Sequence, residues 1–175
     1  MDLYWFDLET TGLSPEHDSI LEIAIYKATL EDPFNLQFVY SKVLNLTNTS
    51  SLDDFVKKMH TKNGLLEECT KSDTYIDSVQ NDLLELIPAA PDRKSMPVCA
   101  GSSIHFDVSF LKHHLPIFAE RFSHRHYDIS SVKLFCQSLG MPEFRKAEAH
   151  RAKDDILESV AHAKECAEWL KTNLK

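Results

Sequence analysis

The sequence predicts an α/β fold in which a mixed β-sheet carries helices on both faces. Three observations indicate it: strand-like runs crowd the first 46 residues, shorter strand-like runs later alternate with helical ones, and apolar residues in those helical runs recur every three or four positions. With 175 residues and 43% hydrophobic content, the chain is long enough to bury one sizeable core. We therefore expect a single domain over residues 1–175.

The N-terminal part is predicted to form a β-meander. Its first strand is the aromatic-rich run from Leu3, which ends in the turn at Thr10–Gly12, where glycine can adopt conformations closed to other residues. Residues 19–29 and 36–46 are the next two strands, separated by a turn around Pro33.

The rest of the chain alternates helices with short strands. Ser51 is a plausible N-cap of a first helix, Pro116 is expected to stop a later one, and Gly140 to follow another. The predicted helices cover about residues 52–60, 65–69, 74–87, 106–115, 130–139 and 150–173, and the predicted strands cover 96–100 and 127–129.

Two carboxylates, Asp7 and Glu9, end the first strand. Side chains alternate along a strand, so these two point to one face while Leu8 points to the other. Two like charges beside a core repel each other unless a cation lies between them, and oxygen ligands suit a hard divalent cation. The alternative is that both acids are solvated residues leading into a turn.

Further acids lie near the starts of later helices. Asp107, Asp154 and Asp155 could be site residues or simply acids that stabilise a helix N-terminus. His150 and Asp154 would share a helical face, whereas His150 could approach Asp155 only from a loop or first turn. Spacing alone leaves both pairs open.

Composition limits the classes of partner and compartment. The net charge of −8 argues against binding of long nucleic acids but permits a short strand gripped at a few phosphates. No apolar run is long enough to span a membrane, and strand-like residues begin directly after Met1, so we expect a cytoplasmic protein. The four cysteines show no metal-binding spacing and are expected to be reduced and mostly buried.

Three motifs together resemble a known family. D-L-E-T-T-G-L at residues 7–13, F-D-x-x-F-L at 106–111 and H-x-x-x-x-D at 150–155 are similar, in order and spacing, to the motifs of the DEDDh 3′-to-5′ exonucleases. Within that family the chain resembles the oligoribonucleases over nearly its whole length, including segments at 60–65, 101–104, 125–130 and 154–159.

The resemblance implies a ribonuclease H-like three-layer fold with a five-stranded mixed sheet, and a metal-dependent exonuclease that cuts short oligonucleotides to 5′-mononucleotides. It implies that Asp7, Glu9, Asp107 and Asp155 hold two Mg²⁺ or Mn²⁺ ions and that His150 accepts the proton of the attacking water. It also selects Asp155 over Asp154 as the ligand.

The resemblance further implies substrate contacts and a homodimer. Leu13 would wedge against the terminal bases, and Phe55 would stack on a base. Ser103 would lie near the 3′ end of the substrate. The phosphate at the other end would be capped by residues supplied partly by a second subunit: His60, Arg125 and Ser130.

The chain departs from the oligoribonuclease pattern at Thr10, at Phe55 and at His105–Phe106. RNA and DNA therefore both remain possible substrates. Two alternatives stay open, an exonuclease that trims longer DNA or RNA ends and a catalytically silent nucleic-acid-binding module.

Overall fold

A computed structural model of the chain describes residues 1–49, 52–144 and 150–173. Within them, five strands form one sheet in the order β3-β2-β1-β4-β5. The meander pairs β1, β2 and β3 antiparallel, whereas β4 and β5 run parallel to β1. This mixed sheet confirms the predicted fold class; its strands are β1 (Asp2–Thr10), β2 (Ile20–Thr29), β3 (Gln37–Val43), β4 (Val98–Gly101) and β5 (His126–Asp128).

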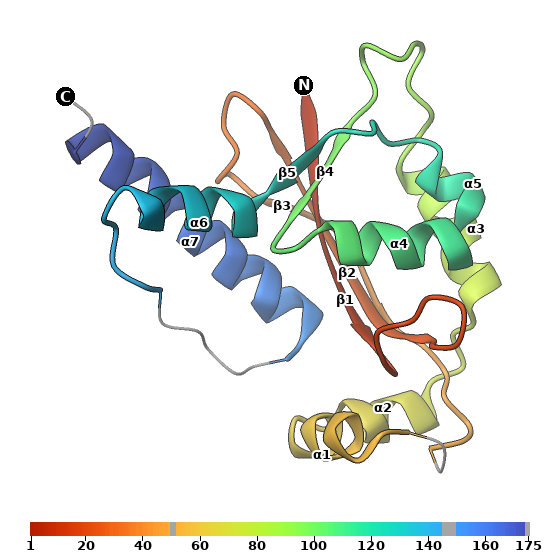
Figure 1. The fold of residues 1–175 in the computed structure, drawn as a ribbon. Coiled ribbons are helices and arrows are strands. Elements are labelled where there is room, and N and C mark those ends of the chain that lie inside the picture. Colours follow the sequence, from red (N-terminus) through yellow and green to blue (C-terminus); the bar gives the residue numbers. More distant parts are fainter. Residues whose placement is uncertain (50–51, 145–149, 174–175) are drawn as a thin grey trace.

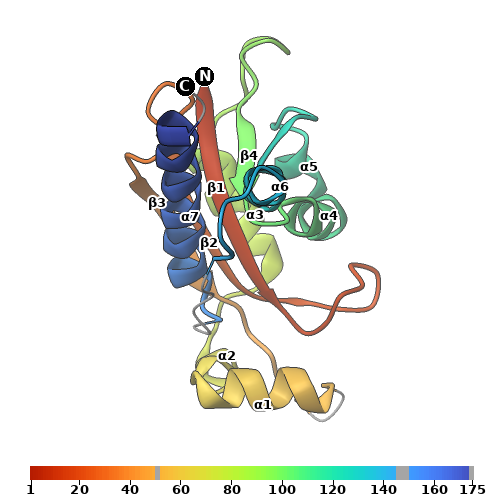
Figure 2. The ribbon, with the colours of Figure 1, turned by 60° about the vertical axis from the view of Figure 1, so that its left-hand side comes forward.

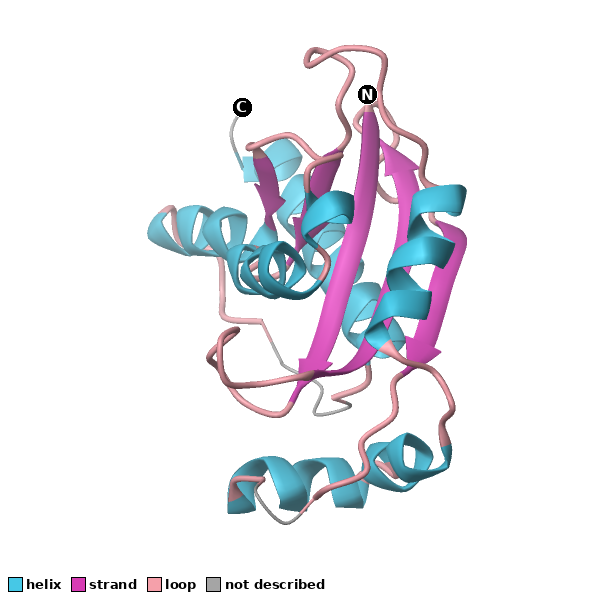
Figure 3. Cartoon of the chain, turned by 90° about the vertical axis from the view of Figure 1, so that its right-hand side faces the viewer, coloured by secondary structure: helices cyan, strands magenta, loops and turns pink. Residues whose placement is uncertain are grey.

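Helices cover both faces of the sheet, giving three layers (Figures 1 and 2). One face carries α3 (Ile76–Leu86), α4 (His105–His114) and α5 (Pro116–Ala119), and the other carries α6 (Ile129–Ser138) and α7 (Ala152–Asn173). The remaining pair, α1 (Asp54–Lys62) and α2 (Leu65–Lys71), lies beyond the end of the sheet, as Figure 3 also shows. The acidic end of β1 therefore points toward α1 and α2.

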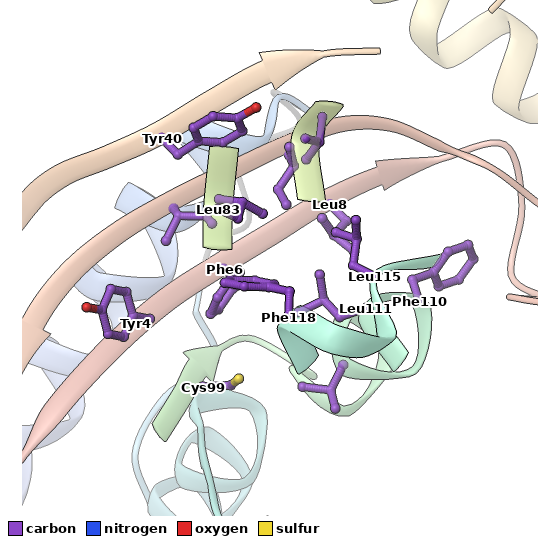
Figure 4. Packing of buried hydrophobic residues seen from close by; sticks show 14 of the residues in the cluster. Tyr4, Phe6, Leu8, Tyr40, Leu83, Cys99, Phe110, Leu111, Leu115 and Phe118 are labelled. Carbon is purple, nitrogen blue, oxygen red and sulfur yellow. The ribbon is translucent and has the colours of Figure 1, made fainter. Parts of the chain in front are cut away.

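Alternation along β1 divides its side chains between the two layers. Tyr4, Phe6 and Leu8 face α3–α5, where they pack with buried residues of those helices (Figure 4). Leu3 and Trp5 face α7 on the other side. Continuing that register places Asp7 and Glu9 on the α7 face, as the strand period predicts.

Small residues let α7 lie close to the sheet. Ala24 and Ala28 of β2 are buried beneath it, and they pack in one cluster with Ala152, Ile156 and Val160 of the helix. Alanine side chains leave room for close packing, so the first turns of α7 lie against the sheet. This packing fixes the position along β1 at which the acidic residues of α7 approach the strand.

Several element boundaries differ from prediction. Pro116 ends α4 but also begins the unpredicted α5, because a proline at the first helical position loses no hydrogen bond. Asp53 caps α1, its carboxylate accepting a hydrogen bond from the Phe55 amide, and the proposed cap Ser51 lies outside the described residues.

Two other expectations concern cysteines and membrane segments. All four cysteines are free thiols and buried, which confirms that prediction: Cys69, Cys99, Cys136 and Cys166. Among the described helices, none combines the length and the apolar character that a bilayer crossing needs.

Candidate active site

Three carboxylates converge where β1 ends and α7 begins. Asp7, Glu9 and Asp155 each offer an oxygen, and these oxygens all lie within 4.8 Å of one another. Asp154, the neighbour on α7, is exposed and is not part of this cluster. We call the three residues the acidic cluster.

Burial and neighbouring charges raise the pKa values of Asp7 and Glu9. Burial raises the pKa of Asp7 well above its ordinary value, and the nearby charges of Asp107, Glu9 and Asp155 raise it further. Burial, followed by the charges of Asp155 and Glu22, raises the pKa of Glu9 to about 8. Oxygen donors this close to one another are the donor set that a hard divalent cation prefers. The residues therefore fit a hard divalent cation.

Asp107 lies beside the cluster and is buried in the first turn of α4. Its Oδ1 accepts a hydrogen bond of 2.9 Å from the backbone N–H of Leu8, beyond the point where β4 stops pairing with β1. Burial raises its pKa to about 8, while the hydrogen bond from Leu8 opposes that shift. The charge of Asp107 contributes to the raised pKa of Asp7, so the two carboxylates lie near each other.

His150 lies in the turn before α7, as the loop alternative for the His150–Asp155 pair requires. Its φ of 47° is left-handed, a conformation that costs a non-glycine residue free energy and persists only where the surroundings impose it. The side-chain amide of Asn63 donates a hydrogen bond of 2.5 Å to the His150 carbonyl. The helix then begins at Ala152, two residues later than predicted.

An ion-pair network next to His150 escaped the sequence analysis. Glu22 is 3% exposed and lies opposite Glu9 in the β1–β2 register. Its two oxygens accept hydrogen bonds of 3.1 Å from the Arg151 guanidinium, and one of them also accepts the Ala152 amide at 3.1 Å. Arg151 makes a second, bidentate pair with Glu68 of α2 at 2.9 Å. The sequence feature that could have indicated this network is Glu22 itself, a charged residue within an otherwise apolar strand.

His60 faces the acidic cluster and not open solvent. Its side chain is fully buried on α1, and its Nε2 lies 3.6 Å from a Glu9 carboxylate oxygen. Burial, and then the charge of His150, lowers its pKa. Within the described residues neither ring nitrogen has a hydrogen-bond partner. His60 is therefore buried beside Glu9 at the end of β1, and its expected contact with a distal phosphate stays a prediction.

Ser103 and Ser130 lie together, and Asp128 holds them. Their hydroxyl oxygens are 2.9 Å apart, and Asp128 Oδ1 accepts the backbone N–H groups of both residues at 3.1 and 2.9 Å. Ser103 has a left-handed φ of 53°. His105 is exposed, with Nδ1 3.9 Å from the other oxygen of Asp128. Asp128 is a further residue that sequence reasoning missed.

The remaining predicted contacts are on the surface. Leu13 is 84% exposed in the loop after β1, and Phe55 is 70% exposed on α1. Arg125 directly precedes β5 and lines a hollow of about 700 Å³ with Met1 and Arg93, at the end of the sheet opposite the acids. The structure therefore brings Ser103 and Ser130 together but places Arg125 at the other end of β5.

Comparisons with known proteins now assign the family. The family model described as exonuclease (RNase_T) matches residues 4–162. An oligoribonuclease of Haemophilus ducreyi is 33% identical over 93% of this chain and 90% of its own length. A probable oligoribonuclease of Schizosaccharomyces pombe is 33% identical over 90% of this chain, which spans 64% of that protein.

The fold is also that of a solved nuclease. Escherichia coli exonuclease I, in complex with a dT13 oligonucleotide, superposes with a TM-score of 0.69 at 14% identity, over 98% of this chain and 42% of that one. At this identity the likeness establishes the fold alone, whereas the family model and the oligoribonuclease relatives extend over most of the sequence. The chain belongs to the RNase_T exonuclease family.

Proposed function

We propose that the chain is a metal-dependent 3′-to-5′ exonuclease that hydrolyses short oligonucleotides to 5′-mononucleotides. The single observation that carries the proposal is the convergence of three carboxylate oxygens within 4.8 Å at the junction of β1 and α7. The H. ducreyi oligoribonuclease, matched along nearly its whole length, supports the choice of short strands.

The acidic residues would hold the metal, and Mg²⁺ or Mn²⁺ in two ions per site fits their chemistry. Asp7, Glu9 and Asp155 would be the direct ligands, and Asp107 would complete the site. When bound, the ions supply Lewis-acid activation of water and charge stabilisation at the scissile phosphate.

His150 would be the general base. An imidazole can act as the proton acceptor for an attacking water. The left-handed turn places it directly before the helix that carries Asp155. His60, buried against Glu9, would keep that ligand in place.

Exposed groups around the site would bind the substrate. Leu13 and Phe55 offer apolar surfaces for bases, and the paired hydroxyls of Ser103 and Ser130 offer donors for the terminal sugar or a phosphate. Arg125, a cation on an exposed segment, would reach a phosphate only by moving its side chain past β5.

A matched pair of variants on α7 tests the acid set. Asp155→Asn should lower the hydrolysis of a 5′-labelled dinucleotide by at least about 100-fold, whereas Asp154→Asn, on the adjacent exposed residue, should stay within about twofold. Both proteins should show the circular dichroism and melting temperature of a folded chain. Equal activity of the two variants, or full activity in EDTA, would contradict the proposal.

A length series separates the substrate classes. Digestion of 5′-labelled RNA and DNA of two to about ten nucleotides should be fastest for the shortest strands, because an acidic protein lacks the cationic track that long strands need. Rates that rise with length would instead favour the rival function, the trimming of longer 3′ ends.

We also propose that the protein acts as a homodimer in the cytoplasm. Exposed apolar side chains at one helix support self-association, since Leu134 and Phe135 of α6 and its C-cap residue Leu139 all face solvent in the single chain. Light scattering coupled to size-exclusion chromatography should give twice the chain mass, and Phe135→Glu should return the mass of one chain.

A further inference from the structure

We propose that Arg151 is a positioning residue that fixes the turn carrying His150, by holding the buried Glu22 on one side and Glu68 on the other. This inference rests on the proposed function, because it assumes that His150 acts on the attacking water. The inference adds to the proposed function the residue that holds His150, the proposed general base, in position.

The geometry around Arg151 joins three separate elements. The guanidinium binds both oxygens of Glu22 on β2 and both oxygens of Glu68 on α2, at 2.9 to 3.1 Å. Arg151 itself lies in the turn between His150 and the first residue of α7. A planar guanidinium with two bidentate partners has a fixed position and plane, which a lysine could not reproduce.

The turn is held at two adjacent points. Asn63 binds the His150 carbonyl, and the Ala152 amide donates to the same Glu22 oxygen that binds Arg151 Nε. A left-handed non-glycine residue directly before such anchors is held in a conformation it would not choose alone. Release of one anchor therefore allows His150 to relax away from its position.

The ion pair with Arg151 also gives Glu22 a different role from the residues of the acidic cluster. Glu22 lies opposite Glu9 in the sheet, and its charge contributes to the raised pKa values of Asp7 and Glu9. Because both of its oxygens are engaged by Arg151 and Ala152, Glu22 serves the protein as an anchor and leaves the ligand role to the acidic cluster. Five buried or half-buried acids lie here, and the pairing with Arg151 marks Glu22 as the structural one.

The test compares Arg151→Met with Lys153→Met, which removes an exposed cation two residues away on the same segment. Arg151→Met should lower kcat on a dinucleotide at least about tenfold while KM stays within about threefold, and Lys153→Met should change neither by more than about twofold. Arg151→Lys should restore only part of kcat. Mn²⁺ binding, followed by electron paramagnetic resonance, should stay within about threefold in all three.

A double variant distinguishes positioning from mere stabilisation. Arg151→Met alone leaves Glu22 buried and unpaired, so Arg151→Met with Glu22→Gln removes that penalty and should recover the wild-type melting temperature. If Arg151 positions His150, kcat of the double variant stays low, and amide hydrogen exchange of residues 150–156 is faster than in the wild type. Recovery of kcat together with stability would overturn the inference.

The outcomes also separate this inference from the function beneath it. A wild-type protein without metal-dependent hydrolysis would remove the proposed function, and the inference with it. An active wild type whose folded Arg151→Met and double variants keep kcat within about twofold would overturn the inference alone.

Discussion

At the scale of single residues, the site gathers several carboxylates in a buried environment, where ionised carboxylates lower the stability of the fold. Glu9 is buried beside Asp155 and Glu22, and its raised pKa shows that the folded chain binds its proton more tightly than the unfolded chain does. Charge of this kind is retained for binding and not for stability. Arg151 pairs with Glu22 and Glu68, whereas the acidic cluster keeps three carboxylate oxygens within 4.8 Å of one another.

The metal-free protein should lose stability as the pH rises. Glu9 has a pKa of about 8 in the folded chain against an ordinary 4.5, so its contribution is fully present below about pH 4.5 and is lost as the pH rises through 8. In EDTA, the melting temperature should therefore fall between pH 5 and 9 more steeply for the wild type than for Glu9→Gln. Mg²⁺ should restore the melting temperature at pH 8. Identical slopes for the two proteins would contradict the prediction.

At the scale of elements, a loop presents Leu13, a proposed substrate contact, next to the strand end that carries Asp7 and Glu9. The loop of residues 11–18 is organised by Asp18, whose carboxylate accepts hydrogen bonds from the Ser14 amide at 2.9 Å and the Thr11 hydroxyl at 3.1 Å. This arrangement leaves the side chain of Leu13 exposed above the loop. Gly12 is required there, because a Cβ on it would lie 2.4 Å from an Asp18 carboxylate oxygen.

Gly12→Ala should disturb this loop without disturbing the sheet. The added methyl group must displace the Asp18 carboxylate, so Leu13 loses its fixed position and KM for a dinucleotide should rise by about threefold or more. The melting temperature should change little, since the loop lies outside the core clusters. Gly140→Ala is a poor control because its φ is positive, so Ser14→Ala serves instead. An unchanged KM would show that Leu13 does not contact substrate.

A second element, α1, places Phe55 in solvent beyond the acidic end of the sheet. Base stacking on an aromatic ring is worth about 1–3 kcal/mol, so Phe55→Ala should weaken dinucleotide binding by about 5- to 150-fold. Phe55→Trp should retain or strengthen binding, and Tyr75→Ala, at another exposed aromatic residue, should have no effect. Binding can be measured by fluorescence anisotropy with Ca²⁺ in place of the catalytic metal. Equal affinities for wild type and Phe55→Ala would remove the stacking role.

At the scale of the whole molecule, the site depends on the distance between α7 and the sheet. Asp155 comes from the far end of the sequence and meets Asp7 only because α7 packs on the alanines of β2. The opposite layer, with its aromatic core around Phe6 and Phe118, holds the sheet from the other side and supplies Asp107 through α4. Two separate layers thus deliver acids to one strand end.

Overpacking beneath α7 should damage the site and the fold together. Ala24→Leu adds bulk to a fully buried position, which should cost about 1–3 kcal/mol of unfolding free energy and move Asp155 away from Asp7. Ile25→Val, on the other face of the same strand, should cost about 0.5–1.5 kcal/mol. Urea unfolding and Mn²⁺ titration together check this: only Ala24→Leu should weaken metal binding. Equal weakening of metal binding in both variants would contradict the idea that the packing of α7 on the sheet sets the site.

The predictions made from the sequence were strongest where local pattern decides structure. The alternation of β1 placed Asp7 and Glu9 on one face, and the meander and later helices followed from the apolar spacing. Local pattern could not reveal α5, since its four residues are too few for a helical period to be recognised. It also could not show that His60 is buried, because the surroundings of that ring come from β1 and from residues far along the chain.

The sequence by itself determined the layered α/β fold and the ordered set of acids with His150. Both follow from side-chain periodicity and from motif order, which are properties of the chain alone. Only the tertiary structure decided which acids converge and which one is engaged in an ion pair. Asp155 joins Asp7 and Glu9, whereas Glu22 is engaged by Arg151, and that distinction depends on pairings across more than 100 residues. The distinction depends on hydrogen bonds between distant segments and on burial by them, which residue spacing in the sequence cannot reveal.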